Sequence, residues 1–243
     1  MLNRFFLIIF NFLLSVFDFP NKNKIKKFFK RNLLNEKLTI IDIGAHKGET
    51  INFFLSNFNI YKIYAFEPNE ELYKLLLNKR RYISNKVELL NYGVGEEEKI
   101  IPLNITIDSA SSTFNEIDIN SKYYKKKNMI LSMFSNNKTL FDKNQSAKII
   151  KLSSFLDQKN LMKIDILKID TEGFEFKILK GINTIDFKKI RFIYFEHHYD
   201  NMIKKNYKFS DMRSFLEKNN FKQRYKLRMR FRKSFEYIYE KKE

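Results

Sequence analysis

The sequence predicts an α/β fold of three layers, in which a mostly parallel sheet lies between two layers of helices. Short, nearly continuous apolar runs alternate along the chain with segments whose apolar residues recur at helical spacing. Strands of that kind are typical of a parallel sheet that is covered on both faces. The last part of the chain, residues 221–242, holds two β-prone runs in which basic and apolar residues alternate. This pattern predicts a C-terminal antiparallel hairpin at an exposed edge.

The elements follow from these patterns in chain order. Four apolar runs end in polar residues or glycine and are expected to be strands, and a fifth run, 86–95, ends in glycines. The segments between them repeat apolar residues every three or four positions, and Pro68 stands at the entry of one of them, where a missing N–H is harmless. The expected strands are 38–44, 62–67, 86–95, 163–170 and 190–198, and the expected helices are 49–58, 69–80, 174–180 and 210–220.

Length and composition favour one main domain. A chain of 243 residues with 44% hydrophobic residues can bury one sizeable core, which we assign to residues 36–243. Within it, residues 112–148 form a polar insert without clear periodicity, and such long loops commonly serve as lids or substrate-binding segments. The absence of cysteine excludes disulfides, zinc ribbons and thiol catalysis and suits a reducing compartment, so we expect a cytoplasmic protein.

The N-terminal segment, residues 1–35, combines an apolar stretch with a basic one. The apolar stretch 5–17 is shorter than the roughly 20 residues that a spanning helix needs, and it lacks the cleavage pattern of a secretory signal. Two alternatives remain open: residues 1–31 contact the inner membrane surface peripherally, or they form a helix packed on the core. Loss of liposome sedimentation on deleting residues 1–30 would support the first, and full-length protein that never sediments would contradict it.

The turn after the first predicted strand, "IDIGAHKGET", suits a ligand that approaches the backbone closely. Glycines are scarce in this chain, yet Gly44 and Gly48 both lie here, beside Asp42 and Ala45. His46 takes the place of the middle glycine of a dinucleotide fingerprint, and no Walker pattern follows. The turn therefore predicts a cofactor without a phosphate chain.

Polar residues end the other strands at the same edge of the sheet. Glu67 ends the second strand, where a carboxylate can accept hydrogen bonds from both ribose hydroxyls. Together the strand ends describe an adenosine with an amino-acid tail, which is S-adenosylmethionine. The predicted cofactor-binding residues are Asp42, Gly44, Ala45, His46, Gly48, Glu67, Asn91, Gly93 and Asp170.

The order of these motifs resembles the FkbM family of class I S-adenosylmethionine-dependent methyltransferases. The resemblance covers about residues 38–225 and is most specific in "LKIDTEGFEFKILKG", residues 167–181, with further blocks in "YAFEPNEEL", "NYGVGEEE", "SSTF" and "IYFEHH". It implies a Rossmann-like three-layer fold and O-methylation of hydroxyls on small molecules, sugars or polyketides. The Asn/Asp-Pro-Pro-Tyr element of many nucleic-acid amino-group methylases is absent. The chain departs from the family at Ser154, where an acidic residue is common.

Four residues at the strand ends are candidates for catalysis: Asp170, Glu172, Glu196 and His197. We expect Asp170 to face the methionine end of the cofactor and Glu172 to point toward the acceptor, with helix capping by Glu172 as the alternative. His197 and His198 point to opposite faces of a strand, and we choose His197 as the general base. Asp170, Glu196 and a histidine could also hold a divalent metal, since carboxylate and imidazole are acceptable ligands, but nothing fixes their spacing, so we predict no metal and leave this alternative open.

The sequence thus predicts an O-methyltransferase that acts on a hydroxyl of a small molecule, sugar or glycan. The net charge of +18 supports an alternative, an RNA methyltransferase that uses a basic surface. We favour a solvated lysine surface over that nucleic-acid reading, because lysine rather than arginine supplies most of the charge. A second alternative is a noncatalytic, membrane-associated protein that retains the fold.

Overall fold

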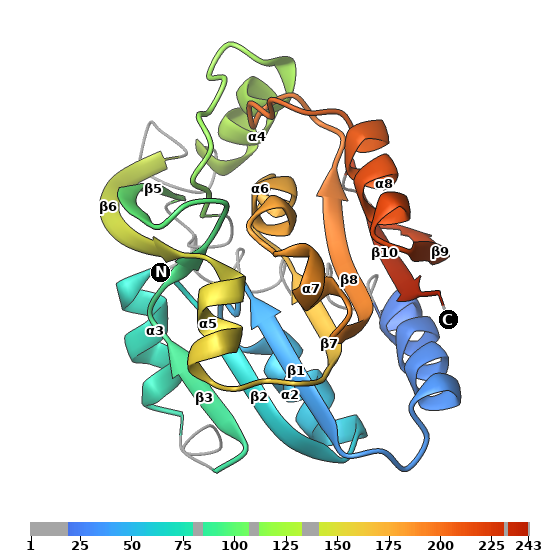
Figure 1. The fold of residues 1–243 in the computed structure, drawn as a ribbon. Coiled ribbons are helices and arrows are strands. Elements are labelled where there is room, and N and C mark those ends of the chain that lie inside the picture. Colours follow the sequence, from blue (N-terminus) through green and yellow to red (C-terminus); the bar gives the residue numbers. More distant parts are fainter. Residues whose placement is uncertain (1–18, 80–84, 107–111, 133–140, 231–232, 243) are drawn as a thin grey trace.

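A seven-stranded sheet forms the centre of the molecule, as Figure 1 shows. The computed structural model describes residues 19–79, 85–106, 112–132, 141–230 and 233–242. The strand order is β3-β2-β1-β7-β8-β10-β9. In this sheet β10 runs in the opposite direction to the other six strands. The predicted α/β fold with a C-terminal antiparallel hairpin is confirmed. The strands are β1 (Leu38–Ile43), β2 (Ile60–Phe66), β3 (Val87–Leu90), β7 (Ile164–Ile169), β8 (Ile190–His198), β9 (Phe221–Arg228) and β10 (Ser234–Lys241).

The register of the sheet brings polar residues of different strands side by side. Asp42 of β1 pairs with Lys168 of β7, and Lys168 pairs in turn with Tyr194 of β8. On the far side of β8, Glu196 pairs with Glu236 of β10. Paired residues on neighbouring strands project to the same face, and so do Tyr194 and Glu196, which are two residues apart on β8. Asp42, Lys168, Tyr194, Glu196 and Glu236 therefore form one polar row across four strands.

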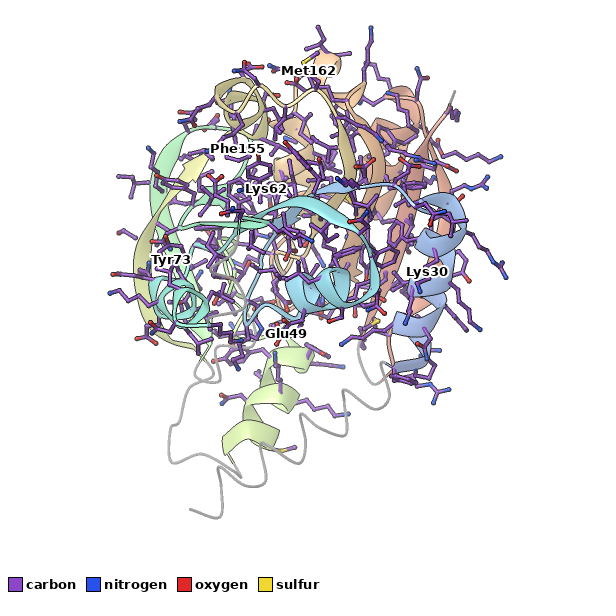
Figure 2. The ribbon with its side chains drawn as sticks, turned by 90° about the horizontal axis from the view of Figure 1, so that it is seen from below. Lys30, Glu49, Lys62, Tyr73, Phe155 and Met162 are labelled. Carbon is purple, nitrogen blue, oxygen red and sulfur yellow. The ribbon has the colours of Figure 1, made fainter. Side chains whose placement is uncertain are left out.

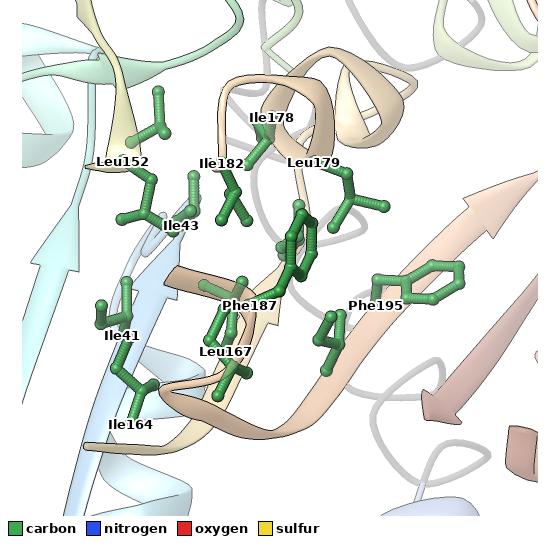
Figure 3. Packing of buried hydrophobic residues seen from close by; sticks show 14 of the residues in the cluster. Ile41, Ile43, Leu152, Ile164, Leu167, Ile178, Leu179, Ile182, Phe187 and Phe195 are labelled. Atoms are coloured by element: carbon green, nitrogen blue, oxygen red, sulfur yellow. The ribbon is translucent and has the colours of Figure 1, made fainter. Parts of the chain in front are cut away.

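One face of the sheet is covered by four helices. They are α5 (Leu152–Gln158), α6 (Glu175–Lys180), α7 (Thr184–Phe187) and α8 (Phe209–Lys218). Leu152, Ile178 and Phe187 from these helices pack on sheet residues such as Ile41 and Leu167 (Figure 3). This cluster of closely packed apolar side chains holds the four helices on the sheet.

The other face is covered by the helical residues 19–32, α2 (Glu49–Asn57) and α3 (Glu70–Leu77). Ile25 and Phe29 are fully buried, and the ring of Phe29 lies against Phe54 of α2 and Phe192 of β8. Lys30 lies on this helix among its exposed residues (Figure 2). Residues 19–32 therefore pack on the core, while residues 1–18 lie outside the described part. No helix among the described residues is long and apolar enough to cross a membrane.

A second sheet of three strands, in the order β4-β6-β5, differs from the sequence-based expectation. Its strands are β4 (Gly93–Val94), β5 (Lys99–Thr106) and β6 (Phe141–Ile150). The single strand predicted over 86–95 is thus two strands in two sheets. The predicted insert, 112–148, contains helix α4 (Lys122–Ser132) and much of β6. Strand β5 was not predicted because it contains Pro102, which weakens a strand pattern. Proline is found in strands mainly at sheet edges, and β5 is an edge strand.

Candidate active site

A cavity of about 500 Å³ opens at the carboxyl ends of the parallel strands. This is the edge of an open α/β sheet where ligands bind, and the volume lies in the range of small-molecule sites. Residues of the turn after β1, the end of β2, the end of β7, β8, β10 and the helix over 19–32 form its wall. They include Lys22, Ile25, Gly44, Ala45, His46, Lys47, Glu49, Thr50, Phe53, Glu67, Pro68, Leu72, Leu103, Ser112, Phe114, Lys168, Asp170, Thr171, Glu172, Tyr194, Glu196, Met229 and Glu236.

The turn after β1 needs its glycines because two backbone segments meet there. Gly44 has a φ of +89°, and a Cβ on it would lie 1.9 Å from the carbonyl oxygen of Asp170. Gly48 has a φ of +85° and precedes α2 as its N-cap. His46 lines the cavity, and its Nδ1 lies 3.3 Å from Oε2 of Glu49. Glu49 lies on the side of the molecule from which α4 projects (Figure 2). Only glycine fits at Gly44, so the close turn that the sequence predicts is present.

Glu67 lies in the cavity wall at the end of β2 and is 4% exposed. Its carboxylate accepts backbone N–H groups of His46 at 2.7 Å and of Asn69 at 2.9 Å, which fixes its direction. Burial raises the pKa of Glu67, and the two N–H donors oppose that shift. A buried, oriented carboxylate of this kind suits the recognition of paired ribose hydroxyls.

Four predicted cofactor-binding residues, Asp42, Gly48, Asn91 and Gly93, lie outside the cavity wall. The Asn91 side chain donates to the carbonyl oxygen of Glu67 at 2.8 Å and so supports the turn behind it. Gly93 belongs to β4 and leaves room for the ring of Phe114, which would lie 2.7 Å from a Cβ there. Asp42 is 1% exposed, and neither of its carboxylate oxygens accepts a hydrogen bond from the described residues. Asn91 and Gly93 thus support two wall residues, Glu67 and Phe114, and none of the four forms the wall itself.

A buried polar row lies beneath the part of the cavity that is farther from the turn after β1. Lys168 is 3% exposed, and its Nζ lies 3.1 Å from Oδ2 of Asp170 and 4.6 Å from the ring centre of Tyr194. Burial alone would lower the pKa of Lys168, but the carboxylates around it, Asp170 first, raise it. The hydroxyl of Tyr194 donates to Glu236, whose pKa burial raises to about 7. The floor of the cavity is thus a charged network of one ammonium and several carboxylates.

Glu172 turns its side chain toward the cavity and does not cap a helix. It has a φ of +50°, an uncommon conformation for a residue with a side chain. Helix α6 begins three residues later, and Glu175, which is fully buried, accepts the N–H of Gly173 at 2.7 Å. The capping alternative for Glu172 is therefore wrong, since Glu175 satisfies this turn.

The structure corrects the choice between the two histidines. His198 lies on the same face of β8 as Glu196, and its Nε2 is 3.3 Å from Glu172 and 3.5 Å from Glu196. Burial opposes charge on this imidazole, yet Glu172, Asp200 and Glu196 raise the pKa of His198 to about 10. His197 points to the opposite face, where burial lowers its pKa to about 3. His197 points away from Glu172 and Glu196, whereas His198 contacts both, so the prediction that His197 is the general base does not fit the geometry.

The sequence contained a signal for the histidine that contacts Glu172 and Glu196, which is His198. Side chains alternate along a strand with a period of two, so Tyr194, Glu196 and His198 share one face once Glu196 is assigned to the site. Lys168 follows in the same way from Asp170. No comparable signal pointed to Glu236 or Lys22, because their place depends on how the C-terminal hairpin and the N-terminal helix pack on the sheet.

A comparison with protein families identifies the domain. The family model of the methyltransferase FkbM domain matches residues 42–223, which is most of the chain. A search of curated proteins finds no match. The matched residues span the turn after β1, the end of β7 and β8, and thus the elements that form most of the cavity wall.

Solved structures of methyltransferases share this fold. The crystal structure of methyltransferase FkbM from Methylobacillus flagellatus KT superposes with a TM-score of 0.52 at 15% identity, over 87% of this chain and 46% of that one. TrmK of M. capricolum, in complex with S-adenosylhomocysteine, has a TM-score of 0.51 at 12% identity, over 92% and 68%. A putative rRNA methylase from Clostridium thermocellum gives 0.51 at 9% identity, over 91% and 95%. This chain thus spans about half the length of the M. flagellatus protein.

These matches agree with the strand order and with the position of the cavity. The likeness to the solved structures, at such low identity, concerns the fold. The family model adds the domain type. The methyl donor of this family and fold is S-adenosylmethionine, as the sequence predicts, and the chain belongs to the FkbM methyltransferase family.

Proposed function

We propose that the protein transfers the methyl group of S-adenosylmethionine to a hydroxyl of a small molecule, sugar or glycan. The position of Glu172 supports this most directly. Its carboxylate lies in the cavity wall beside Asp170, 3.3 Å from Nε2 of His198. A carboxylate held at the edge of the donor site suits the removal of a proton from an attacking hydroxyl.

The residues around the turn after β1 fit the donor. Gly44 allows the backbone of that turn to meet Asp170 closely, and Glu67 presents a buried, oriented carboxylate for a ribose. Asp170, which follows β7, lies between this end of the cavity and the polar row. A bound S-adenosylmethionine would supply a methyl group on a positively charged sulfur, and the carboxylates of the wall would favour that charge.

The transfer would proceed as one substitution. The acceptor oxygen forms a bond to the methyl carbon while the bond between that carbon and sulfur breaks, and the hydroxyl proton passes to Glu172. The sulfur keeps the electron pair and leaves as the neutral thioether of S-adenosylhomocysteine. The protein's main contribution would be to align the two reactants, because methyl transfer depends strongly on in-line geometry.

An RNA acceptor is the second candidate function, and two observations favour it. The chain carries a net charge of +18, and the structurally similar C. thermocellum protein is described as a putative rRNA methylase. The cavity floor argues for the smaller, uncharged acceptor, since Glu172, Glu196 and Glu236 would repel phosphate groups.

The test is a screen for S-adenosylhomocysteine release with sugars, hydroxylated small molecules and RNA as acceptors, followed by Glu172→Gln. With the acceptor that responds, we expect the variant to lose about a hundredfold or more in kcat, while calorimetry shows unchanged affinity for S-adenosylmethionine. Equal turnover of variant and wild type would contradict the role of Glu172. Release with RNA alone, in a binding reaction that weakens steeply with salt, would contradict the small-molecule acceptor.

A further inference from the structure

We propose that Asp170, Glu196 and His198 form a binding site for a divalent cation. One ligand atom from each of these side chains lies within 4.8 Å of the other two. The residues come from the ends of the neighbouring strands β7 and β8, so the sheet itself fixes their spacing. The proposal rests on the proposed function, because the cation would lie where the acceptor is expected, and it revises the sequence-based expectation of no metal.

The spacing of the three donors is close to that required by a single cation. Two ligand atoms on opposite sides of a cation with bonds of about 2.1 Å lie about 4.2 Å apart. The three ligand atoms lie within 4.8 Å of one another. To bind one cation, the most distant pair would have to move about half an ångström closer, by rotation of the side chains. Glu196 is 5% exposed and lines the cavity, and both Asp170 and Glu196 belong to its wall.

The second ring nitrogen of His198 is oriented as in metal sites. Nδ1 lies 3.7 Å from Oδ2 of Asp200, and Asp200 in turn accepts the N–H of Met202 at 3.0 Å. Nε2, on the other side of the ring, is buried and forms no hydrogen bond with the described residues. A carboxylate behind the imidazole is the usual outer partner of a metal-binding histidine, since it fixes both tautomer and ring direction.

The charge of the cavity floor also favours an additional cation. Four carboxylates act on the ammonium of Lys168, namely those of Asp170, Glu236, Glu196 and Asp42. Lys168 is in contact with Oδ2 of Asp170 and lies beside the ring of Tyr194. A cation bound between Asp170 and Glu196 would lower the repulsion among these carboxylates.

The donor set indicates the kind of cation. Two carboxylates and one imidazole combine the ligands of Mn²⁺ and Mg²⁺ with one that first-row transition ions accept readily. We therefore expect Mn²⁺ to bind more tightly than Mg²⁺. Three protein ligands leave coordination positions for the acceptor oxygen, whose proton a cation makes easier to remove. Glu172, 3.3 Å from Nε2 of His198, would still be near enough to accept that proton.

The experiment measures Mn²⁺ binding to the full-length protein directly. The protein is stripped with a chelator, exchanged into metal-free buffer and titrated with Mn²⁺, and free Mn²⁺ is followed by electron paramagnetic resonance with and without S-adenosylhomocysteine. We expect one Mn²⁺ per chain, and at least tenfold weaker binding in Glu196→Gln and His198→Ala. Asp200→Asn, which changes only the outer partner, should lose about tenfold, the lower end of the effect seen for such partners.

His197→Ala is the matched control, because it removes the neighbouring histidine on the opposite face of β8. It should keep the Mn²⁺ affinity within twofold. Glu196→Gln and Asp200→Asn preserve side-chain shape, and retained S-adenosylhomocysteine binding by calorimetry shows that each variant is folded. No Mn²⁺ binding by wild-type protein that binds S-adenosylhomocysteine would overturn the cation site and leave the methyltransferase proposal intact. Absence of both ligands would overturn both proposals, and equal Mn²⁺ affinity in all four variants would place the cation elsewhere.

Discussion

The two faces of β8 differ in chemistry although their residues alternate along the same strand. On the face toward the helix over 19–32 and α2, the strand presents Tyr194 and Glu196 to the cavity, and His198 to the carboxylates of Glu172 and Glu196. Toward the helices α6 and α8, it presents Phe195 and His197. The ring of His197 lies 4.8 Å from that of Tyr199 and 5.2 Å from that of Phe209.

The adjacent histidines show what this difference does to a side chain of one type. His198 lies among carboxylates that hold its pKa near 10, and His197 lies among aromatic rings where burial holds its pKa near 3. Burial disfavours the charged imidazole on both faces, but carboxylates outweigh it at His198, whereas at His197 the nearby charges of Lys205 and His198 add to it and only Asp200 opposes it. One face therefore packs apolar and aromatic side chains, and the other carries the charged groups on which the proposed function and the proposed cation site depend. Three predictions test this division.

The largest expected effect is on stability and comes from the packed face. Phe195 is fully buried, and its ring stacks on Tyr237 at 5.4 Å and on Tyr239 at 5.8 Å. Phe195→Ala should lower the free energy of unfolding by about 3–5 kcal/mol, because it removes a buried ring and leaves a cavity. Urea unfolding followed by circular dichroism measures this change. Tyr194→Phe, on the other face, keeps the ring and should cost about 1–2 kcal/mol; equal losses in the two variants would contradict the comparison.

A second prediction concerns turnover and separates the two histidines. With the acceptor identified, His198→Ala should lower kcat by about a hundredfold, since it removes the imidazole that lies 3.3 Å from Glu172 and is a proposed cation ligand. His197→Ala should keep kcat within about threefold and lose stability instead, because its ring contacts aromatic side chains and no cavity residue. Steady-state kinetics at saturating S-adenosylmethionine gives both values. A larger kcat loss for His197→Ala would reverse the assignment.

The smallest of the three effects is the pH dependence that Asp42 gives to the stability of the ligand-free protein. Burial raises the pKa of Asp42 from 3.8 to about 7. Between these values the folded protein keeps a proton that the unfolded chain releases, so this contribution to stability is complete below pH 4 and is lost as the pH rises to 7. The difference corresponds to at most about 4 kcal/mol. Asp42→Asn should remove that loss.

At pH 8 we expect Asp42→Asn to be more stable than wild type by about 2 kcal/mol, because the cost of burying an unpaired amide offsets part of the gain. Urea unfolding at pH 5 and pH 8 measures the change, with Asp165→Asn as a control carboxylate that is buried but already accepts an N–H of Thr39. If the stability of wild type and of Asp42→Asn depends on pH in the same way, burial does not raise the pKa of Asp42, and the prediction is wrong.

Much of the architecture could be read from the residues alone. The strands over 38–43, 60–66, 164–169 and 190–198 are nearly uniform apolar runs, and each is buried on both sides in the structure. The turn at Gly44 and the carboxylate of Glu67 were also predictable, because few residue types satisfy a left-handed turn or a ribose. These features depend on neighbours close in sequence or on a period that the chain displays.

What the sequence did not reveal depends on contacts between distant segments. The second sheet joins residues 93–94, 99–106 and 141–150, and its β5 contains Pro102, which weakens a strand pattern. The packing of the helix over 19–32 brings Lys22 and Ile25 to the cavity wall, and the antiparallel β10 brings Glu236 to the polar row. Sequence spacing carries no information on which distant segments will pack together.

The sequence by itself therefore determined the alternation of strands and helices, the donor-side turn and the family, because all of these are encoded in local residue order. The tertiary structure decided which histidine contacts Glu172 and Glu196, which carboxylates surround Lys168, and that ligand atoms of Asp170, Glu196 and His198 lie close together. The physical reason is that charge, burial and ligand distance are properties of groups brought together across strands. They exist only once the sheet has formed.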